Sequence, residues 1–173
     1  MRFALSLIIL LVCGSFADAQ QILSRDRAQF KDKEYIQVWV NKYITPDHRR
    51  QQRAISVACQ QWGRVINKKF YWARKPENAD IVFDVGGAVW FVGKKRNILA
   101  TTHDYIDKQH IVMRASNKVQ VRMKLHSLIL HELGHALGLK EHTGPGTVMD
   151  PYPTRSSLSH ADVVRIRKLY GIE

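Results

Sequence analysis

The pattern of apolar residues divides the first two thirds of the chain into short predicted elements. The run Tyr35–Val40 is rich in β-branched and aromatic residues and predicts a first strand. A helix should follow, because Thr45-Pro46-Asp47 is a typical N-terminal capping signal and apolar residues then recur at helical spacing. That apolar face consists of Ile55, Ala58, Trp62, Val65 and Ile66. Further short strands are predicted at residues 70–72, 81–83, 97–102 and 111–114.

The last third of the chain has the periodicity of two helices. Apolar positions recur every three or four residues over 122–139, where Gly138 is a stop signal. A final helix should begin at Ser159 with Asp162 as its capping acid, and it should end before Gly171. The pattern therefore predicts an α+β fold, in which a sheet packs against a long first helix and a second helix and a C-terminal helix follow.

Residues 1–19 have the pattern of a cleaved signal peptide. One positive charge precedes an apolar run over 3–12, which is short for a bilayer span, and Ala17-Asp18-Ala19 is a small-residue cleavage site. An uncleaved membrane anchor is the alternative. We expect export to the extracellular space or periplasm, a short N-terminal segment over 20–32, a folded domain over 33–173, and no membrane span in the mature chain.

Composition limits the class of protein. A chain of 173 residues with 45% apolar residues is the size of one domain, and we expect a monomer. Its 27 basic and 15 acidic residues give a net charge of +12, which favours encounters with acidic partners or keeps the surface soluble. The basic residues are scattered and form no recognised nucleic-acid motif, so no specific nucleic-acid partner is expected. After cleavage Cys59 would be the only cysteine, which excludes an internal disulfide and indicates a buried core residue.

The candidate chemistry lies in the sequence His131-Glu-Leu-Gly-His135. Two histidines four residues apart lie on one face of a helix, where both can bind one metal ion. Glu132 lies one residue further round the helix, where its carboxylate can take a proton from a zinc-bound water that attacks a peptide carbonyl. The same carboxylate can return the proton to the leaving amine.

The residues 131–138 resemble the start of the metzincin signature, and Thr147-Val148-Met149-Asp150 resembles the methionine turn of that family. The similarity is closest to the matrixin branch and covers about residues 33–173. It implies a metzincin-type α+β catalytic domain with a twisted mixed sheet and an active-site helix at 122–139. It also implies Zn²⁺ as cofactor and Met149 as an apolar floor beneath the metal. The segment 20–32 is too short for a matrixin propeptide and has no cysteine to block the zinc.

The third metal ligand departs from the family pattern. The family places this ligand three residues after the glycine, where this chain has Glu141, and His142 follows one residue later. Zinc accepts both imidazole nitrogen and carboxylate oxygen. We favour His142, because a one-residue insertion in a turn is structurally easy and three neutral imidazoles leave the ion its full charge. The alternatives are Glu141 as the third ligand and a degenerate site that binds zinc poorly.

Other candidate residues surround this motif. Tyr152 is expected either to pack or to line the specificity pocket, and Ile98-Leu99-Ala100 resembles the edge strand along which matrixins lay an extended peptide. His103, Asp104, Asp107 and His110 are interpreted as exposed polar residues of a loop, with a second metal site as the alternative.

These observations predict a zinc metalloendopeptidase that acts on protein or peptide substrates, with His131, His135 and His142 as metal ligands and Glu132 as general base. The alternative is a zinc-stabilised binding module with a basic surface and little or no turnover. Glu132 favours the enzyme, because a binding module has no need of a general base beside the two histidines.

Overall fold

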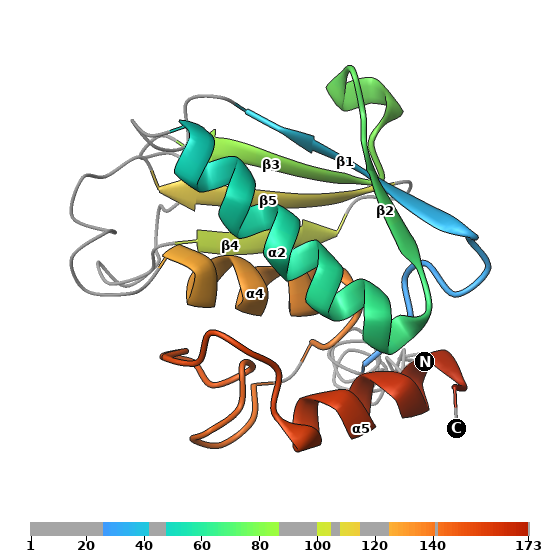
Figure 1. The fold of residues 1–173 in the computed structure, drawn as a ribbon, viewed down its shortest axis with the longest axis vertical. Helices are drawn as coiled ribbons and strands as arrows, with labels where there is room; N and C mark the ends of the chain where they lie inside the picture. The colour runs from blue at the N-terminus through green and yellow to red at the C-terminus, as the bar shows by residue number, and fades with distance from the viewer. Residues whose placement is uncertain are drawn as a thin grey trace, which may run out of the picture.

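The computed structural model describes residues 26–41, 48–86, 100–104, 108–114, 125–140 and 142–172. Within these residues it contains five strands, three α-helices and one 3-10 turn (Figure 1). In chain order they are β1 (Tyr35–Val40), α2 (His48–Ile66), β2 (Lys69–Trp72), η1 (Pro76–Asn78), β3 (Ile81–Gly86), β4 (Ala100–Asp104), β5 (Gln109–Arg114), α4 (Leu125–Ala136) and α5 (His160–Tyr170). The predicted α+β class is confirmed.

The five strands form one mixed sheet in the order β2-β1-β3-β5-β4. β1 pairs in parallel with both β2 and β3, and β3 pairs in parallel with β5. β4 is antiparallel to β5, with Thr102 opposite Ile111. The two edges of the sheet are therefore β2 on one side and β4 on the other.

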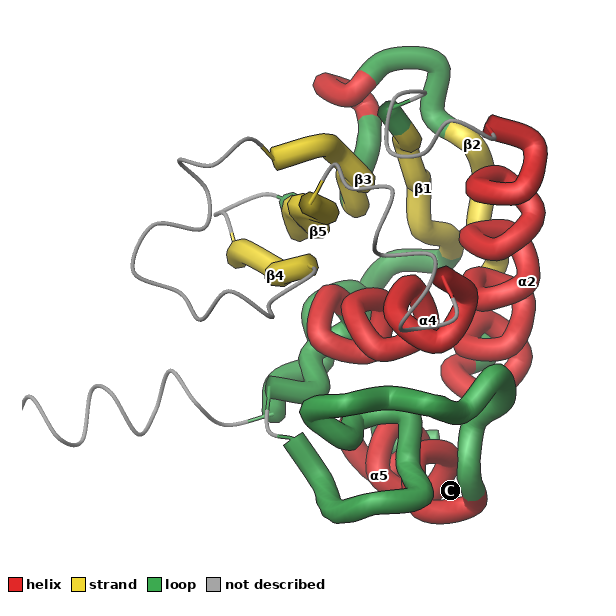
Figure 2. The backbone as a smooth tube through the Cα atoms, turned by 90° about the vertical axis from the view of Figure 1, so that its left-hand side faces the viewer, coloured by secondary structure: helices red, strands yellow, loops and turns green. Residues whose placement is uncertain are grey.

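Helices α2 and α4 cover one face of the sheet, and α4 lies between the sheet and α5 (Figures 1 and 2). The predicted apolar face of α2 is buried in the core, where Trp62 is fully inaccessible to solvent. Its indole nitrogen donates a hydrogen bond of 3.0 Å to the carbonyl oxygen of Leu130 on α4. This buried bond fixes α4 against α2, and it thereby fixes the position of the residues that follow Leu130.

The C-terminal helix begins and ends where the sequence predicts. The Ser159 side chain accepts from the backbone nitrogen of Asp162, and the Asp162 side chain accepts from the backbone nitrogen of Ser159, which forms a capping box. Gly171 ends α5 in the left-handed conformation. The Asp162 carboxylate also accepts from the backbone nitrogen of Val148 at 3.1 Å, so the cap of α5 holds the segment that contains Met149.

Some predicted elements have different bounds in the structure. The second predicted helix ends at Ala136 rather than at residue 139, because Leu137 and Gly138 form a turn in which Gly138 has a φ of 115°. The strand predicted at 81–83 extends to Gly86. The capping signal at 45–47, the first half of the predicted strand at 97–102 and residues 1–19 lie outside the described residues.

No helix in the described part of the chain combines the length and the apolar character that a membrane crossing requires.

Candidate metal centre

Helix α4 presents His131 and His135 on the same side, one turn apart, as the four-residue spacing predicts. His131 is 5% exposed, so the first imidazole lies within the protein rather than on its surface. The two rings meet edge to face with their centroids 4.6 Å apart.

Backbone carbonyl groups orient both rings. The Nδ1 atom of His131 lies 2.7 Å from the carbonyl oxygen of Val148, and the Nδ1 atom of His135 lies 2.6 Å from that of Leu139. A carbonyl oxygen only accepts, so each Nδ1 carries the proton and donates. The lone pair of each ring is therefore on Nε2, which is the arrangement that metal-binding histidines adopt.

His142 brings a third imidazole to this pair. Its Nε2 lies 3.4 Å from the Nε2 of His135, and the Nε2 atoms of His131 and His135 are 3.1 Å apart. Tetrahedral zinc with bonds of about 2.0–2.1 Å to nitrogen separates two ligand nitrogens by about 3.3 Å. Among the described residues, these three side chains form the group that could bind one metal ion. The donor set therefore fits zinc in number, type and spacing.

Burial keeps these imidazoles neutral. Burial, together with the neighbouring imidazoles, lowers the pKa of His131 to about 4 and the pKa of His135 to about 3. The pKa of His142 is also lowered by its partial burial, although the Asp150 carboxylate acts in the opposite direction. Only a neutral imidazole binds a metal ion, so protons compete little for these nitrogens near neutral pH.

Glu132 points toward β4 rather than toward solvent. It is 5% exposed, and its Oε2 accepts a hydrogen bond of 2.7 Å from the hydroxyl group of Thr102. Thr102 belongs to β4, and sequence analysis did not single it out as a functional residue. Its contribution depends on the packing of β4 against α4, which no local sequence signal reports.

Residues 26 and 27 hold the turn that leads from α4 to His142 in place. The backbone nitrogen of Arg27 donates to the carbonyl oxygen of Gly138 at 2.9 Å, and the Asp26 carboxylate accepts from the backbone nitrogen of Lys140 at 2.9 Å. Asp26 also forms an ion pair with Arg165 on α5, at 2.6 Å. These contacts fix the turn whose Leu139 carbonyl orients His135.

Replacing Gly138 with alanine is expected to destabilise the protein by about 3 kcal/mol or more. A β-carbon there would overlap the carbonyl oxygen of Arg27, and the φ of 115° is strained for any other residue. Gly144→Ala is the matched control, because a β-carbon at Gly144 meets nothing within 4 Å. Urea unfolding of both variants measures the difference. The expectation is wrong if the two variants unfold at the same urea concentration.

Met149 packs against helix α4. It is fully buried, and a β-carbon added to Gly134 on α4 would stand 2.5 Å from its sulfur. The neighbouring Val148 carbonyl holds His131, as described above. The segment 147–150 therefore supports α4 from below, as its resemblance to the methionine turn implies.

The other candidate residues are distributed differently from the sequence interpretation. Tyr152 is 73% exposed, which excludes simple packing. His103 and Asp104 lie on β4 and His110 lies on β5, so the interpretation of these residues as a loop is wrong. His103 and His110 are partners in the antiparallel pairing, and Asp104 forms an ion pair with Lys140 at 2.5 Å. Asp107, Glu141, Ile98 and Leu99 lie outside the described residues.

A comparison with family models agrees with this geometry. The model of the matrixin family, peptidase M10, matches residues 30–171, which is most of the chain. Matrixins bind zinc and are metallopeptidases, and the metzincin-type fold expected from the sequence is confirmed. The chain therefore belongs to the matrixin family of zinc metallopeptidases.

Proposed function

We propose that this chain is an endopeptidase that hydrolyses internal bonds of extended peptides, with His131, His135 and His142 as the zinc ligands. The observation that carries the proposal is a buried carboxylate, Glu132, adjacent in the chain to His131, on a helix where three imidazoles converge through their Nε2 atoms. A site that only stored or sensed a metal would have no use for a basic carboxylate there. This feature favours the enzyme over a zinc-stabilised binding module.

The chain's own residues supply the proton transfers. Zinc held at such a site acts as a Lewis acid and lowers the pKa of a water molecule toward about 7. Glu132 takes a proton from the attacking water and returns it to the leaving amine. The hydrogen bond from Thr102 to Oε2 restricts rotation of the carboxylate.

Strand β4 supplies a backbone for the substrate. It is an edge strand of the sheet, and Thr102 in its centre contacts Glu132 directly. An extended peptide that pairs with the edge of β4 would run past Glu132 with its carbonyl groups in a fixed register. Backbone pairing of this kind binds peptides of many sequences, which suits an endopeptidase.

Export is part of the proposal. The pattern of residues 1–19 supports cleavage of a signal peptide, and we place the mature catalytic domain over residues 33–173 after a short segment at 20–32. We further propose that the mature protein acts as a monomer on protein or peptide substrates outside the cytoplasm.

Internally quenched peptides with both ends blocked test the reaction class. Blocked ends exclude exopeptidases, so an increase in fluorescence requires cleavage within the chain. We expect cleavage by the zinc-loaded protein, with mass spectrometry locating the cut between internal residues. Hydrolysis that is confined to peptides with a free end would contradict the endopeptidase assignment.

A further inference from the structure

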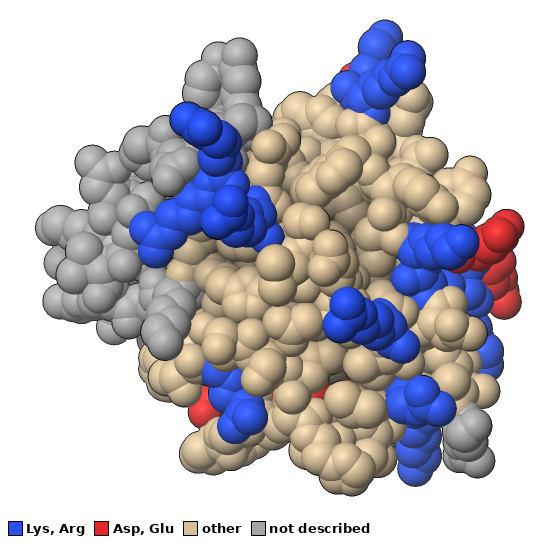
Figure 3. Space-filling model, viewed as in Figure 1, with Lys and Arg blue, Asp and Glu red and all other residues tan. Residues whose placement is uncertain are grey.

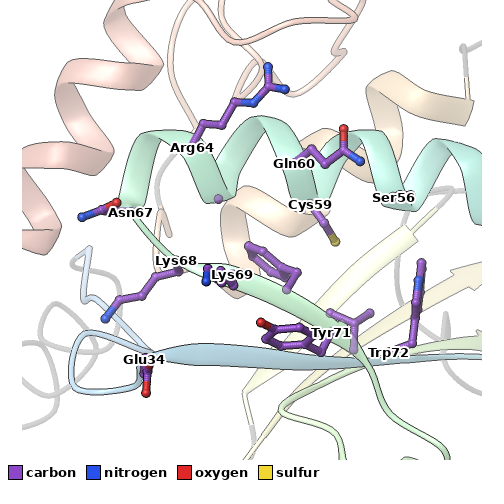
Figure 4. A pocket seen from close by; sticks show the side chains of 13 residues that line it. Glu34, Ser56, Cys59, Gln60, Arg64, Asn67, Lys68, Lys69, Tyr71 and Trp72 are labelled. Carbon is purple, nitrogen blue, oxygen red and sulfur yellow. The ribbon is translucent and has the colours of Figure 1, made fainter.

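A groove of about 520 Å³ lies between α2 and β2, away from the metal centre (Figure 4). β2 and β4 are the opposite edges of the sheet, and Glu132 contacts β4. Four strand spacings of about 4.8 Å separate these edges by roughly 19 Å. A molecule in this groove therefore does not occupy the site where Glu132 and the three histidines meet.

The floor of the groove is apolar. Phe70 and Trp72 lie on the same face of β2. In the pairing with β1 they stand opposite Ile36 and Val38, which are buried. Cys59 of α2 joins this floor, and burial raises the pKa of its thiol to about 12, so the group stays neutral. Trp72 is nevertheless 51% exposed, which leaves a large aromatic side chain open at the end of the groove.

The rim of the groove is positively charged. Arg64, Lys68 and Lys69 line it with Glu34 as the one acidic residue among the lining side chains. Helix α2 contains four arginines and no acidic residue. Arg49 and Arg53 continue the line of Gln60 and Arg64 at helical spacing, so positive charge extends along the helix. Several separate groups of Lys and Arg lie on this face of the molecule, and few acidic residues are visible on it (Figure 3).

We propose that this groove is a docking site for an acidic segment of a protein partner, with an apolar side chain against Trp72 and carboxylates over Arg64 and Lys69. Charge complementarity selects an acidic ligand, and the apolar floor selects a polypeptide with apolar side chains over an anionic polysaccharide, which has none. Among the described strands β2 pairs with β1 alone, so its other edge lies at the border of the sheet beside the groove. The inference does not depend on peptidase activity.

The test measures binding of a fluorescein-labelled peptide in which Asp and Glu alternate with Leu and Phe. Fluorescence anisotropy reports binding to the full chain loaded with zinc and carrying Glu132→Gln, which prevents cleavage of the probe. We expect saturable binding that weakens as salt is added. A peptide with Lys in place of each acidic residue is expected not to bind.

Matched variants locate the site. Arg64→Gln with Lys69→Gln is expected to weaken binding about fivefold or more. The control is Arg155→Gln with Lys168→Gln, which removes the same charge and also changes the last turn of a helix, α5. Binding should change less than about twofold in this control. Trp72→Ala is expected to weaken binding about tenfold, whereas Tyr152→Ala, at an exposed aromatic residue that follows segment 147–150, should not. Thermal melts confirm that each variant is folded.

Three results would overturn the proposal. If both double variants weaken binding equally, the peptide responds only to net charge. If Tyr152→Ala weakens binding and Trp72→Ala does not, the peptide lies in the catalytic cleft. The third result is that a sulfated polysaccharide displaces the peptide, and that binding of the polysaccharide requires Arg64 and Lys69 but not Trp72. The surface is then a site for polyanions in general.

Discussion

Glu132→Gln is expected to lower kcat for peptide hydrolysis by a factor of about 10² to 10⁴, which is the usual contribution of a general base. Glutamine has nearly the same shape, and its amide oxygen still accepts the hydrogen bond from Thr102. It cannot accept a proton from water. Bound zinc and the melting temperature should therefore remain unchanged while turnover is lost.

The measurement combines kcat on a quenched peptide with the zinc content of the same sample. Thr102→Val serves as a companion variant, because it keeps the carboxylate and removes the group that holds Oε2. We expect a smaller loss of kcat for Thr102→Val than for Glu132→Gln. Thr102→Ser, which keeps the hydroxyl group, should restore kcat. Turnover near the wild-type rate in Glu132→Gln would show that another group takes the proton.

His142→Ala is expected to weaken zinc binding by about two orders of magnitude or more, because it removes one of three converging nitrogens. Glu141→Ala should weaken it by about 10 to 100-fold at most, the range for a group that acts on the ligands rather than on the metal. His160→Ala is the control, since this exposed histidine lies at the start of α5. It should bind zinc as the unmodified chain does.

Competition with a chromogenic chelator at one pH gives the three affinities. Melting curves with and without zinc provide a second measure, because a ligand that binds only the folded state raises its stability. If Glu141→Ala releases the metal and His142→Ala retains it, the site consists of two histidines and a carboxylate, and the proposed ligand set is wrong.

Local signals were sufficient to predict much of the fold. The strand Tyr35–Val40 has the predicted bounds, and the capping box of Ser159 and Asp162 stands where the sequence indicates. Both predictions succeed because strand propensity and capping depend on neighbouring residues. The pair His131 and His135 is predictable for the same reason, since helical spacing alone puts the two side chains on one face.

The choice between Glu141 and His142 depends on the path of a turn. Spacing in the sequence left both open, because each lies close to the expected position. The structure brings the His142 imidazole within 3.4 Å of His135, after a turn that Arg27 and Asp26 hold in place. These N-terminal residues are more than a hundred positions away along the chain, and no local pattern connects them with Gly138.

Long-range packing also explains what the sequence interpretation missed. Thr102 reaches Glu132 only because β4 packs beside α4, and a threonine in a strand carries no signal of such a role. His103 and His110 were assigned to a loop because they lie between the strands predicted at 97–102 and 111–114. β4 and β5 instead extend through both histidines, where pairing between the strands outweighs local propensity.

The most direct test of the central claim is a zinc titration of the chain after its metal has been removed with a chelator. Bound zinc and cleavage of casein are measured in the same samples. If this matrixin is a zinc endopeptidase, activity is absent at the start, rises in proportion to bound zinc and stops rising at one zinc per chain. Casein cleavage without zinc would contradict the claim, and so would one bound zinc per chain with no cleavage of casein or of any quenched peptide.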